Sequence, residues 1–275
     1  MLASEPPKPQ DLVVMVLGLY MRPAHATVWS GGLVALLEEL GFSRGASRVA
    51  LARLVNRKLT KRVRRGRLVS YALTARARRV LAEGDRRILT LGRSAGPVEV
   101  WTTLIHQIPE TRRLQRQRLA LRLRFLGFGS LQDGLWISPR DRGREIAPLI
   151  EELGIERHAI VLVGERLPWA TYPLVERAWD LPALVARYRL FAEEFGPYVL
   201  RSGRRELSEA EAFAVRTIMV HLFRGFSFLD PELPDERMPD PRARPHALKV
   251  FECVYEDLAP PAQRHFDSAV TLGGA

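Results

Sequence analysis

Arginine side chains recur between residues 42 and 73 at spacings that suit contact with a polyanion. Arg44 and Arg48 are four residues apart, so both can lie on one exposed helix face. Arginine pairs bidentately with guanine, which makes these two residues candidates for base-edge contacts, while the arginines around Gly66 suit phosphates. The complete set of predicted DNA-binding residues is Arg44, Ser47, Arg48, Val49, Arg53, Arg62, Arg64, Arg65 and Arg67.

The basic charge is concentrated in one part of the chain. The 275 residues include 42 Lys or Arg and 31 Asp or Glu, a net charge of +11. Residues 42–93 contain 16 basic and two acidic residues, a net of +14, which leaves −3 for all the others. Such a basic module favours a nucleic-acid partner. The alternative is a solvent-exposed helix face, since arginine is also a good helix former.

The elements around these arginines follow the order of a winged helix. Leu12–Met21 is an apolar run that predicts a buried helix, and Ser30 is placed to cap a second helix that Gly41 ends. Ser43 can cap a third helix over 44–57, with Ala50, Leu51 and Leu54 on its buried face. Gly66 then supplies the turn of a hairpin, and Thr74 caps a further helix that Gly84 closes. We therefore predict a winged helix-turn-helix domain over residues 11–93.

The middle of the chain changes character after the segment GRSAGP at 92–97. A β-branched and aromatic run at 98–108, a helix over 110–126, a hairpin at Asp133-Gly134, a helix over 145–153 and a strand over 158–163 follow in turn. The order strand–helix–strand–strand–helix–strand predicts a ferredoxin-like βαββαβ domain over 97–167.

The last part reads as a helical domain over 168–275. The expected helices are 174–194 (with a break at Pro182), 208–226 and 245–266, with a proline-dense loop between the last two. The whole chain is therefore predicted to be of the α+β class.

Composition excludes several classes of protein. The lone Cys253 leaves no internal disulfide and no zinc finger built on cysteine pairs, which fits a reducing cytoplasm. The first residues have no signal-peptide core, and no run reaches the roughly 18 apolar residues of a membrane span. No Ser–His–Asp order, GxGxxG or P-loop is present, so we expect no enzyme, no metal and no cofactor.

A second group of residues could bind a small anionic effector. His221 and Arg224 share a helix face, and Arg216 lies two turns earlier. Trp179 and Tyr188 could line an aromatic pocket. The alternatives are an internal pair that anchors the acidic loop through Asp230, and aromatic side chains that belong to the core.

Four segments of the chain resemble the PaaX family of bacterial transcriptional repressors of phenylacetic acid catabolism. They are ALARLVNR, LGFGSLQDGLWISP, RAWDLPALVARYRLFAEEF and RTIMVHLFRGFSFLDPELP. The resemblance implies a winged helix, a middle domain like small CRISPR-associated ferredoxin-fold nucleases, and a helical C-terminal domain. It also implies a homodimer on palindromic double-stranded operator DNA, released by an acyl-CoA thioester such as phenylacetyl-CoA.

The chain departs from the family pattern at two places near its C-terminus. The late loop reads MPDPRARPHA without the family's tryptophan, and His221-Leu222-Phe223-Arg224 keeps only the two ends of the family's His-Glu-Tyr-Arg. A rival function is a metal-dependent nuclease, with Glu110 as the carboxylate nearest the first strand of the middle domain. A structural nucleoid or RNA-binding protein is a third possibility.

Overall fold

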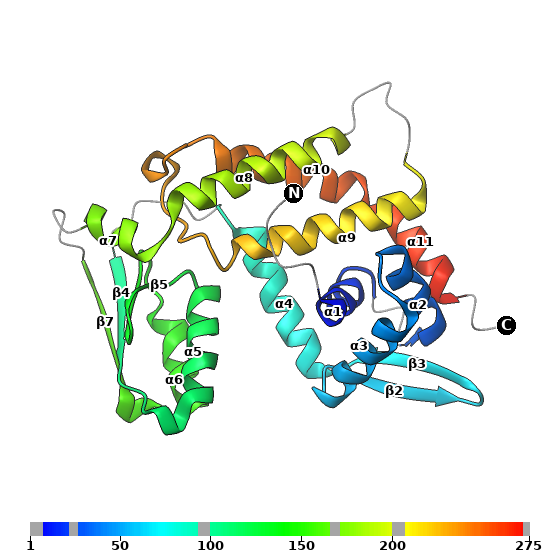
Figure 1. Cartoon of the computed structure of the whole chain (residues 1–275), viewed down its shortest axis with the longest axis horizontal. Coiled ribbons are helices and arrows are strands. Elements are labelled where there is room, and N and C mark those ends of the chain that lie inside the picture. Colours follow the sequence, from blue (N-terminus) through cyan, green and yellow to red (C-terminus); the bar gives the residue numbers. More distant parts are fainter. Residues whose placement is uncertain (1–7, 22–26, 93–99, 166–170, 200–206, 272–275) are drawn as a thin grey trace. The chain divides into compact units, whose positions relative to one another are not determined.

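The computed structural model describes residues 8–21, 27–92, 100–165, 171–199 and 207–271. Contacts divide the chain into two compact units (Figure 1). Unit 1 consists of Met1–Leu89, Phe191–Phe223 and Lys249–Ala275, and unit 2 of Thr90–Leu190 and Arg224–Leu248. This division differs from the three predicted sequence domains, because part of the predicted C-terminal domain packs on the N-terminal helices.

Three helices open unit 1: α1 (Pro9–Tyr20), α2 (Ser30–Glu39) and α3 (Arg44–Asn56). Gly41 has a φ of 89° in the turn just after α2, so the predicted end of this helix is confirmed. Ser43 caps α3 as predicted, because its Oγ accepts a hydrogen bond of 3.2 Å from the Ala46 N–H. Ser30 does not cap α2, since the helix already begins at that residue. The predicted buried face of α3 is confirmed.

A small antiparallel sheet follows α3. Its strands are β1 (Val28–Trp29), β2 (Thr60–Arg65) and β3 (Leu68–Leu73), in the order β1-β3-β2. Gly66 has a φ of 60°, so the predicted hairpin turn is confirmed. Strand β1 was not predicted from the sequence, although Val28 and Trp29 both pair with β3. A strand of two residues is too short to give a period in the sequence.

Thr74 joins the hairpin to helix α4 (Ala75–Thr90). Its Oγ donates to the carbonyl of Lys58 at 2.8 Å and accepts from the Ala77 N–H at 3.1 Å, so the predicted cap is confirmed. The predicted end at Gly84 was wrong. Gly84 is buried on the same face as Leu81 and Ile88, and the helix continues because this apolar face continues.

The C-terminal helices pack directly on the N-terminal ones within unit 1. The Tyr20 ring lies 5.1 Å from that of Phe213 and 5.5 Å from that of Phe266, and its hydroxyl is hydrogen-bonded to Thr217. The Gln263 side chain donates to the Tyr20 carbonyl at 3.0 Å. The helices concerned are α8 (Leu181–Phe195, its last residues), α9 (Glu209–Phe226), α10 (Ala243–Asp257) and α11 (Ala259–Thr271).

The predicted single helix over 245–266 is two helices, α10 and α11. The chain breaks at Leu258, just before Pro260 and Pro261. These prolines stand in the first turn of α11, where their missing N–H groups need no partner.

Unit 2 contains a four-stranded antiparallel sheet in the order β5-β6-β4-β7. Gly134 has a φ of 77°, which confirms the predicted hairpin at Asp133-Gly134 between β5 and β6. The strands are β4 (Val100–His106), β5 (Gly129–Gln132), β6 (Leu135–Ser138) and β7 (Ala159–Glu165). The helices between them are α5 (Arg113–Phe125) and α6 (Gly143–Leu153).

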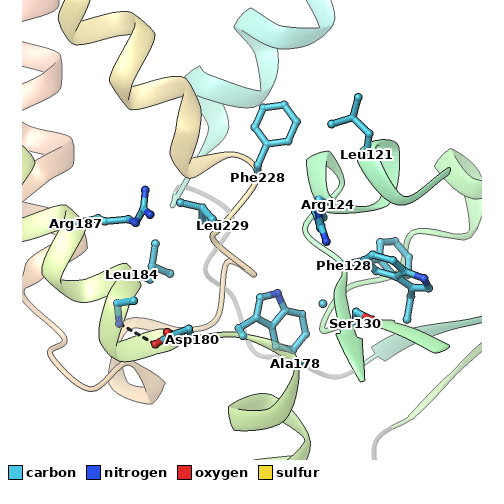
Figure 2. Close-up of a pocket in the computed structure, with 14 residues that line it drawn as sticks. Leu121, Arg124, Phe128, Ser130, Ala178, Asp180, Leu184, Arg187, Phe228 and Leu229 are labelled. Carbon is cyan, nitrogen blue, oxygen red and sulfur yellow. Dashed lines mark hydrogen bonds between the residues drawn. The ribbon is translucent and has the colours of Figure 1, made fainter. Parts of the chain in front are cut away.

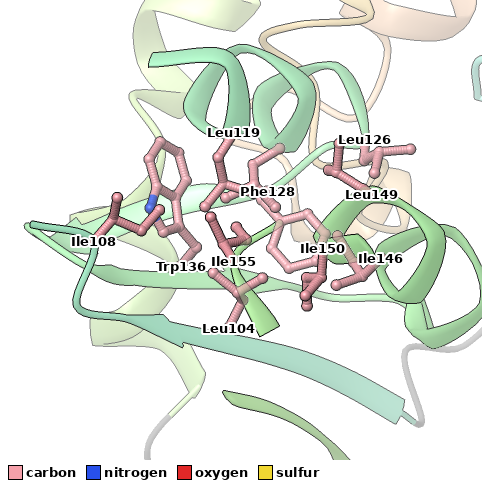
Figure 3. Packing of buried hydrophobic residues seen from close by; sticks show 11 residues of the cluster. Leu104, Ile108, Leu119, Leu126, Phe128, Trp136, Ile146, Leu149, Ile150 and Ile155 are labelled. Atoms are coloured by element: carbon pink, nitrogen blue, oxygen red, sulfur yellow. The ribbon is translucent and has the colours of Figure 1, made fainter. Parts of the chain in front are cut away.

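Helices α5 and α6 cover one face of this sheet, and a hydrophobic core lies between these helices and the strands (Figure 3). Leu104 of β4 and Trp136 of β6 point toward Leu119 of α5 and Ile146 of α6, and Phe128 fills the space between the helices and the strands. Burying apolar side chains of β4, β6 and β7 on one sheet face fixes the register of these strands.

Unit 2 is completed by α7 (Thr171–Ala178), the first part of α8 and the loop before α10. The predicted helix break near Pro182 is confirmed but lies slightly earlier, at Trp179 and Asp180. The Asp180 Oδ1 accepts from the Ala183 N–H at 3.0 Å, so Asp180 caps α8 and Pro182 falls in its first turn. Short 3-10 turns lie at Glu110–Arg112, Glu156–His158, Gly196–Tyr198 and Asp235–Arg237.

Candidate nucleic-acid interface and ligand pocket

The outer face of α3 carries most of the predicted base-contacting residues. Arg44, Arg48 and Arg53 are exposed, and Val49 keeps 51% of its surface exposed although it is apolar. The opposite face of the helix is anchored in the core of unit 1. A basic face on a helix held rigidly from behind is the arrangement that enters a DNA groove.

Arg44 is partly engaged within the protein. Its Nε lies 2.9 Å and 3.0 Å from the two carboxylate oxygens of Glu38. Because the arginine side chain is 73% exposed, this pair contributes little to stability and can exchange for a phosphate. Glu38 therefore orients Arg44 along the turn between α2 and α3.

Ser47 is a correction to the predicted set. It is fully buried, and its hydroxyl donates to the Ser43 carbonyl at 3.0 Å. With Ala50, Leu51 and Leu54 it follows the i, i+3, i+4, i+7 spacing of the buried face, a signal that the sequence already contained. We therefore leave Ser47 out of the proposed DNA contacts.

A second group of arginines lies on the hairpin β2-β3, whose strand β2 contacts α3 (Figure 1). Arg62, Arg64 and Arg67 are exposed. Arg65 pairs with Leu68 across the turn, and its side chain lies outside the part of the structure that is described. The alternation along β2 keeps Arg62 and Arg64 on one side of the ribbon, so they can follow a phosphate backbone together.

Arg216, predicted to bind an effector, is instead enclosed within unit 1. Only 5% of its surface is exposed, its Nε donates to the Tyr255 carbonyl at 3.1 Å, and its guanidinium stacks over the rings of Tyr255 and Tyr20. Burial raises the pKa of Tyr20. Arg216 therefore connects α9, α10 and α1 by cation–π contacts, which corrects its predicted role.

Tyr188 is likewise committed within the protein, in unit 2. It is fully buried, and its hydroxyl donates to Asp230 at 2.6 Å. Burial, followed by the adjacent Asp230 carboxylate, raises the pKa of Tyr188 well above its ordinary value. The hydroxyl thus stays protonated and acts as a donor to Asp230, and the predicted contact with an effector is not supported.

Sequence reasoning missed Arg244, the cation that pairs with Asp230. Its guanidinium lies 3.2 Å from Asp230 and 2.6 Å from Asp235, and it also donates to the Leu233 carbonyl. Burial lowers the pKa of Arg244, but the carboxylates of Asp230 and Asp235 outweigh burial and raise it. The proline-dense loop is therefore held by an ion-pair cluster in which Tyr188, Asp230 and Arg244 are buried and Asp235 is half-buried.

His221 and Arg224 lie on α9 as predicted, and both are half-buried. Both residues have an interaction partner within the protein. Their predicted role in binding an effector stays a prediction.

Trp179 lines a pocket of about 580 Å³ in unit 2 (Figure 2). The walls come from α5, the sheet, the junction of α7 and α8, and the segment after α9. The lining residues are Leu121, Arg124, Phe128, Gly129, Ser130, Trp136, Ala178, Trp179, Asp180, Ala183, Leu184, Arg187, Phe228 and Leu229.

The Trp136 ring of this pocket is fixed from two sides. Its Nε1 donates to Nε2 of His106 at 3.3 Å, and the Arg124 guanidinium lies 5.9 Å from its ring centre. Burial lowers the pKa of His106, so the neutral ring that can accept this hydrogen bond is favoured. The Trp136 indole is therefore a rigid part of the pocket wall.

Glu110, the carboxylate of the rival nuclease hypothesis, pairs with Arg116 at 2.7 Å and lies near Arg113. Among the residues that the structure describes, His, Cys, Asp and Glu form no group of three or more that could bind a metal. In the same residues, no helix has the length and apolar character needed to cross a membrane.

Three descriptions of one protein family match successive parts of the chain. Residues 8–77 match the PaaX-like protein family, residues 97–173 the PaaX protein central Cas2-like domain, and residues 179–268 the PaaX-like protein C-terminal domain. The chain belongs to the PaaX family. The sequence resemblance is thereby confirmed, and a PaaX-like protein is a transcriptional regulator rather than an enzyme.

One curated relative agrees with this assignment. The transcriptional repressor PaaX of Escherichia coli (strain K12) is 28% identical over 262 residues, which cover 92% of this chain and 81% of that protein. The uncharacterized protein Rv0674 from Mycobacterium tuberculosis has the same fold. Its TM-score is 0.52 at 22% identity, and the match covers 92% of this chain and 96% of that one.

Proposed function

We propose that this PaaX family member is a dimeric bacterial repressor whose residues 9–73 form a winged helix-turn-helix that binds operator DNA. The observation that carries the proposal is the placement of two arginine groups in one compact unit. Arg48 and Arg53 project from α3, while Arg62, Arg64 and Arg67 project from the adjacent hairpin. The helix face is suited to base edges and the hairpin to phosphates.

Dimerisation is proposed to use the ferredoxin-like sheet of unit 2. The sheet face opposite α5 and α6 exposes apolar side chains where β4 pairs with β7: Ile105 is opposite Ile160, and Leu162 lies two residues farther along β7. Ile160 and Leu162 are 59% and 56% exposed. An apolar patch on a sheet face marks a protein–protein interface. A twofold dimer would present two winged helices to a palindromic operator.

Replacing Leu162 with Lys is expected to shift the protein from dimer to monomer, because a charge in the centre of the patch must be desolvated on association. Sedimentation velocity at micromolar concentration measures the change. Leu114→Lys is the matched control, since Leu114 is 67% exposed on α5 of the same unit and outside the patch. Equal dimer fractions in the two variants would place the interface elsewhere.

The effector is proposed to be an acyl-CoA thioester such as phenylacetyl-CoA, which releases the repressor from DNA in the cytoplasm. Release requires that the thioester bind the non-operator arrangement of the protein more tightly than the DNA-bound one. The packing of α9 and α11 on α1 offers a route by which the C-terminal helices can affect the DNA-binding helices.

An electrophoretic mobility shift assay on the protein's own promoter tests this function. We expect a complex that survives excess unrelated duplex DNA and dissociates on addition of phenylacetyl-CoA but not of acetyl-CoA. A complex removed equally by unrelated DNA would support the nucleoid-protein alternative instead. Magnesium-dependent cleavage of the probe, abolished in Glu110→Gln, would support the nuclease.

A further inference from the structure

We propose that the pocket in unit 2 binds a small ligand that joins a flat apolar or aromatic group to an anionic group, and that this pocket is the effector site. The second part of this inference rests on the proposed repressor function. The volume of about 580 Å³ lies within the roughly 300–1,000 Å³ of small-molecule sites. The pocket lies outside the residues predicted from sequence to bind the effector, apart from Trp179.

The inner wall of the pocket is aromatic and rigid. Phe128, Trp136 and Trp179 are each less than 10% exposed, so the protein positions them before any ligand arrives. Gly129 lies between them, and a Cβ at this position would come within 2.6 Å of the Trp179 ring. Preformed aromatic walls favour a flat apolar ligand, because little side-chain entropy is lost on binding.

The opening of the pocket is apolar and carries two cations. Leu121, Phe228 and Leu229 keep 59%, 37% and 38% of their surfaces exposed around it. Arg187 of α8 and Arg124 of α5 lie on different sides of the pocket (Figure 2). Exposed apolar side chains next to arginines suit a ligand whose apolar end is enclosed and whose anionic end faces solvent.

The one acidic side chain in the lining does not cancel this charge. Asp180 already accepts a hydrogen bond from the Ala183 N–H as the cap of α8. Two arginines against one committed carboxylate leave a net positive site. A carboxylate, or the phosphates of a coenzyme A thioester, can therefore pair with Arg187 or Arg124. These two sources of negative charge need separate experimental arms.

Isothermal titration calorimetry of the full-length protein without DNA tests the pocket. The probes are phenylacetate and phenylacetyl-CoA, with benzyl alcohol (aromatic but uncharged) and acetyl-CoA (anionic but not aromatic) as controls. We expect at least one of the two aromatic anions to bind at least about tenfold more tightly than both controls.

Two pairs of variants locate the binding. Ala183→Trp fills the pocket from an exposed position on α8 and is expected to weaken the aromatic anion at least about tenfold. Ala186→Trp, also exposed on α8 but outside the lining, should leave it unchanged. Arg187→Gln should weaken the anionic probes about tenfold and spare benzyl alcohol. Arg177→Gln, exposed on α7, is its matched control.

Binding that is equal in Ala183→Trp and wild type, or no binding of either aromatic anion, would overturn the inference. Promoter binding of Ala183→Trp without effector separates this failure from that of the proposed function. We expect this variant to bind promoter DNA like wild type and to resist release. A wild-type protein that binds the aromatic anion but not its promoter would refute the repressor function and leave the pocket standing.

Discussion

Replacing Arg244 with Met is expected to destabilise unit 2 by about 3–5 kcal/mol, the cost of leaving a buried carboxylate without its cation. Arg244 is 1% exposed and Asp230 is wholly buried. In the variant, Asp230 keeps only the Tyr188 hydroxyl and the Glu232 N–H as donors among its described hydrogen bonds. Urea unfolding followed by circular dichroism measures the change in free energy of unfolding.

The chain offers a matched control for this variant on the surface of the same unit. Arg189 donates to Asp240 at 2.6 Å, but the arginine side chain is 59% exposed. Arg189→Met should therefore cost about 0–1 kcal/mol. The double variant Asp230→Asn with Arg244→Met should recover part of the loss, because no buried charge is then left unpaired. If Arg244→Met costs no more than Arg189→Met, the buried cluster does not hold the loop.

The largest expected effect on function follows from removing the hairpin arginines. The double variant Arg64→Ala and Arg67→Ala should weaken binding to every duplex by about 10–100-fold at moderate salt, and lower the salt slope by roughly 0.9 for each phosphate that the protein no longer neutralises. Fluorescence anisotropy measures both the DNA affinity and the salt slope between about 50 and 300 mM salt, a range in which counterion release changes the affinity strongly. Arg48→Ala should instead relax preference at one position of the operator.

Charge alone must be separated from position in this experiment. Arg157 and Arg177 are exposed residues of unit 2, and their double replacement with Ala removes the same charge. We expect this control to keep the wild-type salt slope. A slope lowered equally in both double variants would mean that net charge, and not the hairpin, sets DNA affinity.

Local features of the fold could be predicted because their signals lie within a few residues. Ser43, Thr74, Gly66 and Gly134 act at the positions predicted for them, since caps and tight turns depend on neighbouring backbone atoms. Gly84 misled the prediction of the end of α4. A glycine inside a helix is decided by the packing around it, and that packing cannot be seen from the neighbouring residues.

The candidate sites were harder to predict because they depend on distant segments. The ion pair of Arg244 with Asp230 joins the first turn of α10 to an irregular loop that has no period. Arg216 and Tyr188 have the chemistry to bind a ligand, but tertiary contacts use their polar groups. The pocket is built from several separate segments, among which the sequence had suggested only Trp179.

The central claim is that the basic helix and hairpin of unit 1 recognise a specific sequence in double-stranded DNA. Selection from a random duplex pool with the full-length protein tests it most directly. We predict enrichment of one palindromic site whose half-sites lie about 34 Å apart, or a multiple of that spacing. Arg48→Ala should lose the preference at one base pair of each half-site. A pool that stays random after repeated selection, while the protein still binds DNA, would contradict the account.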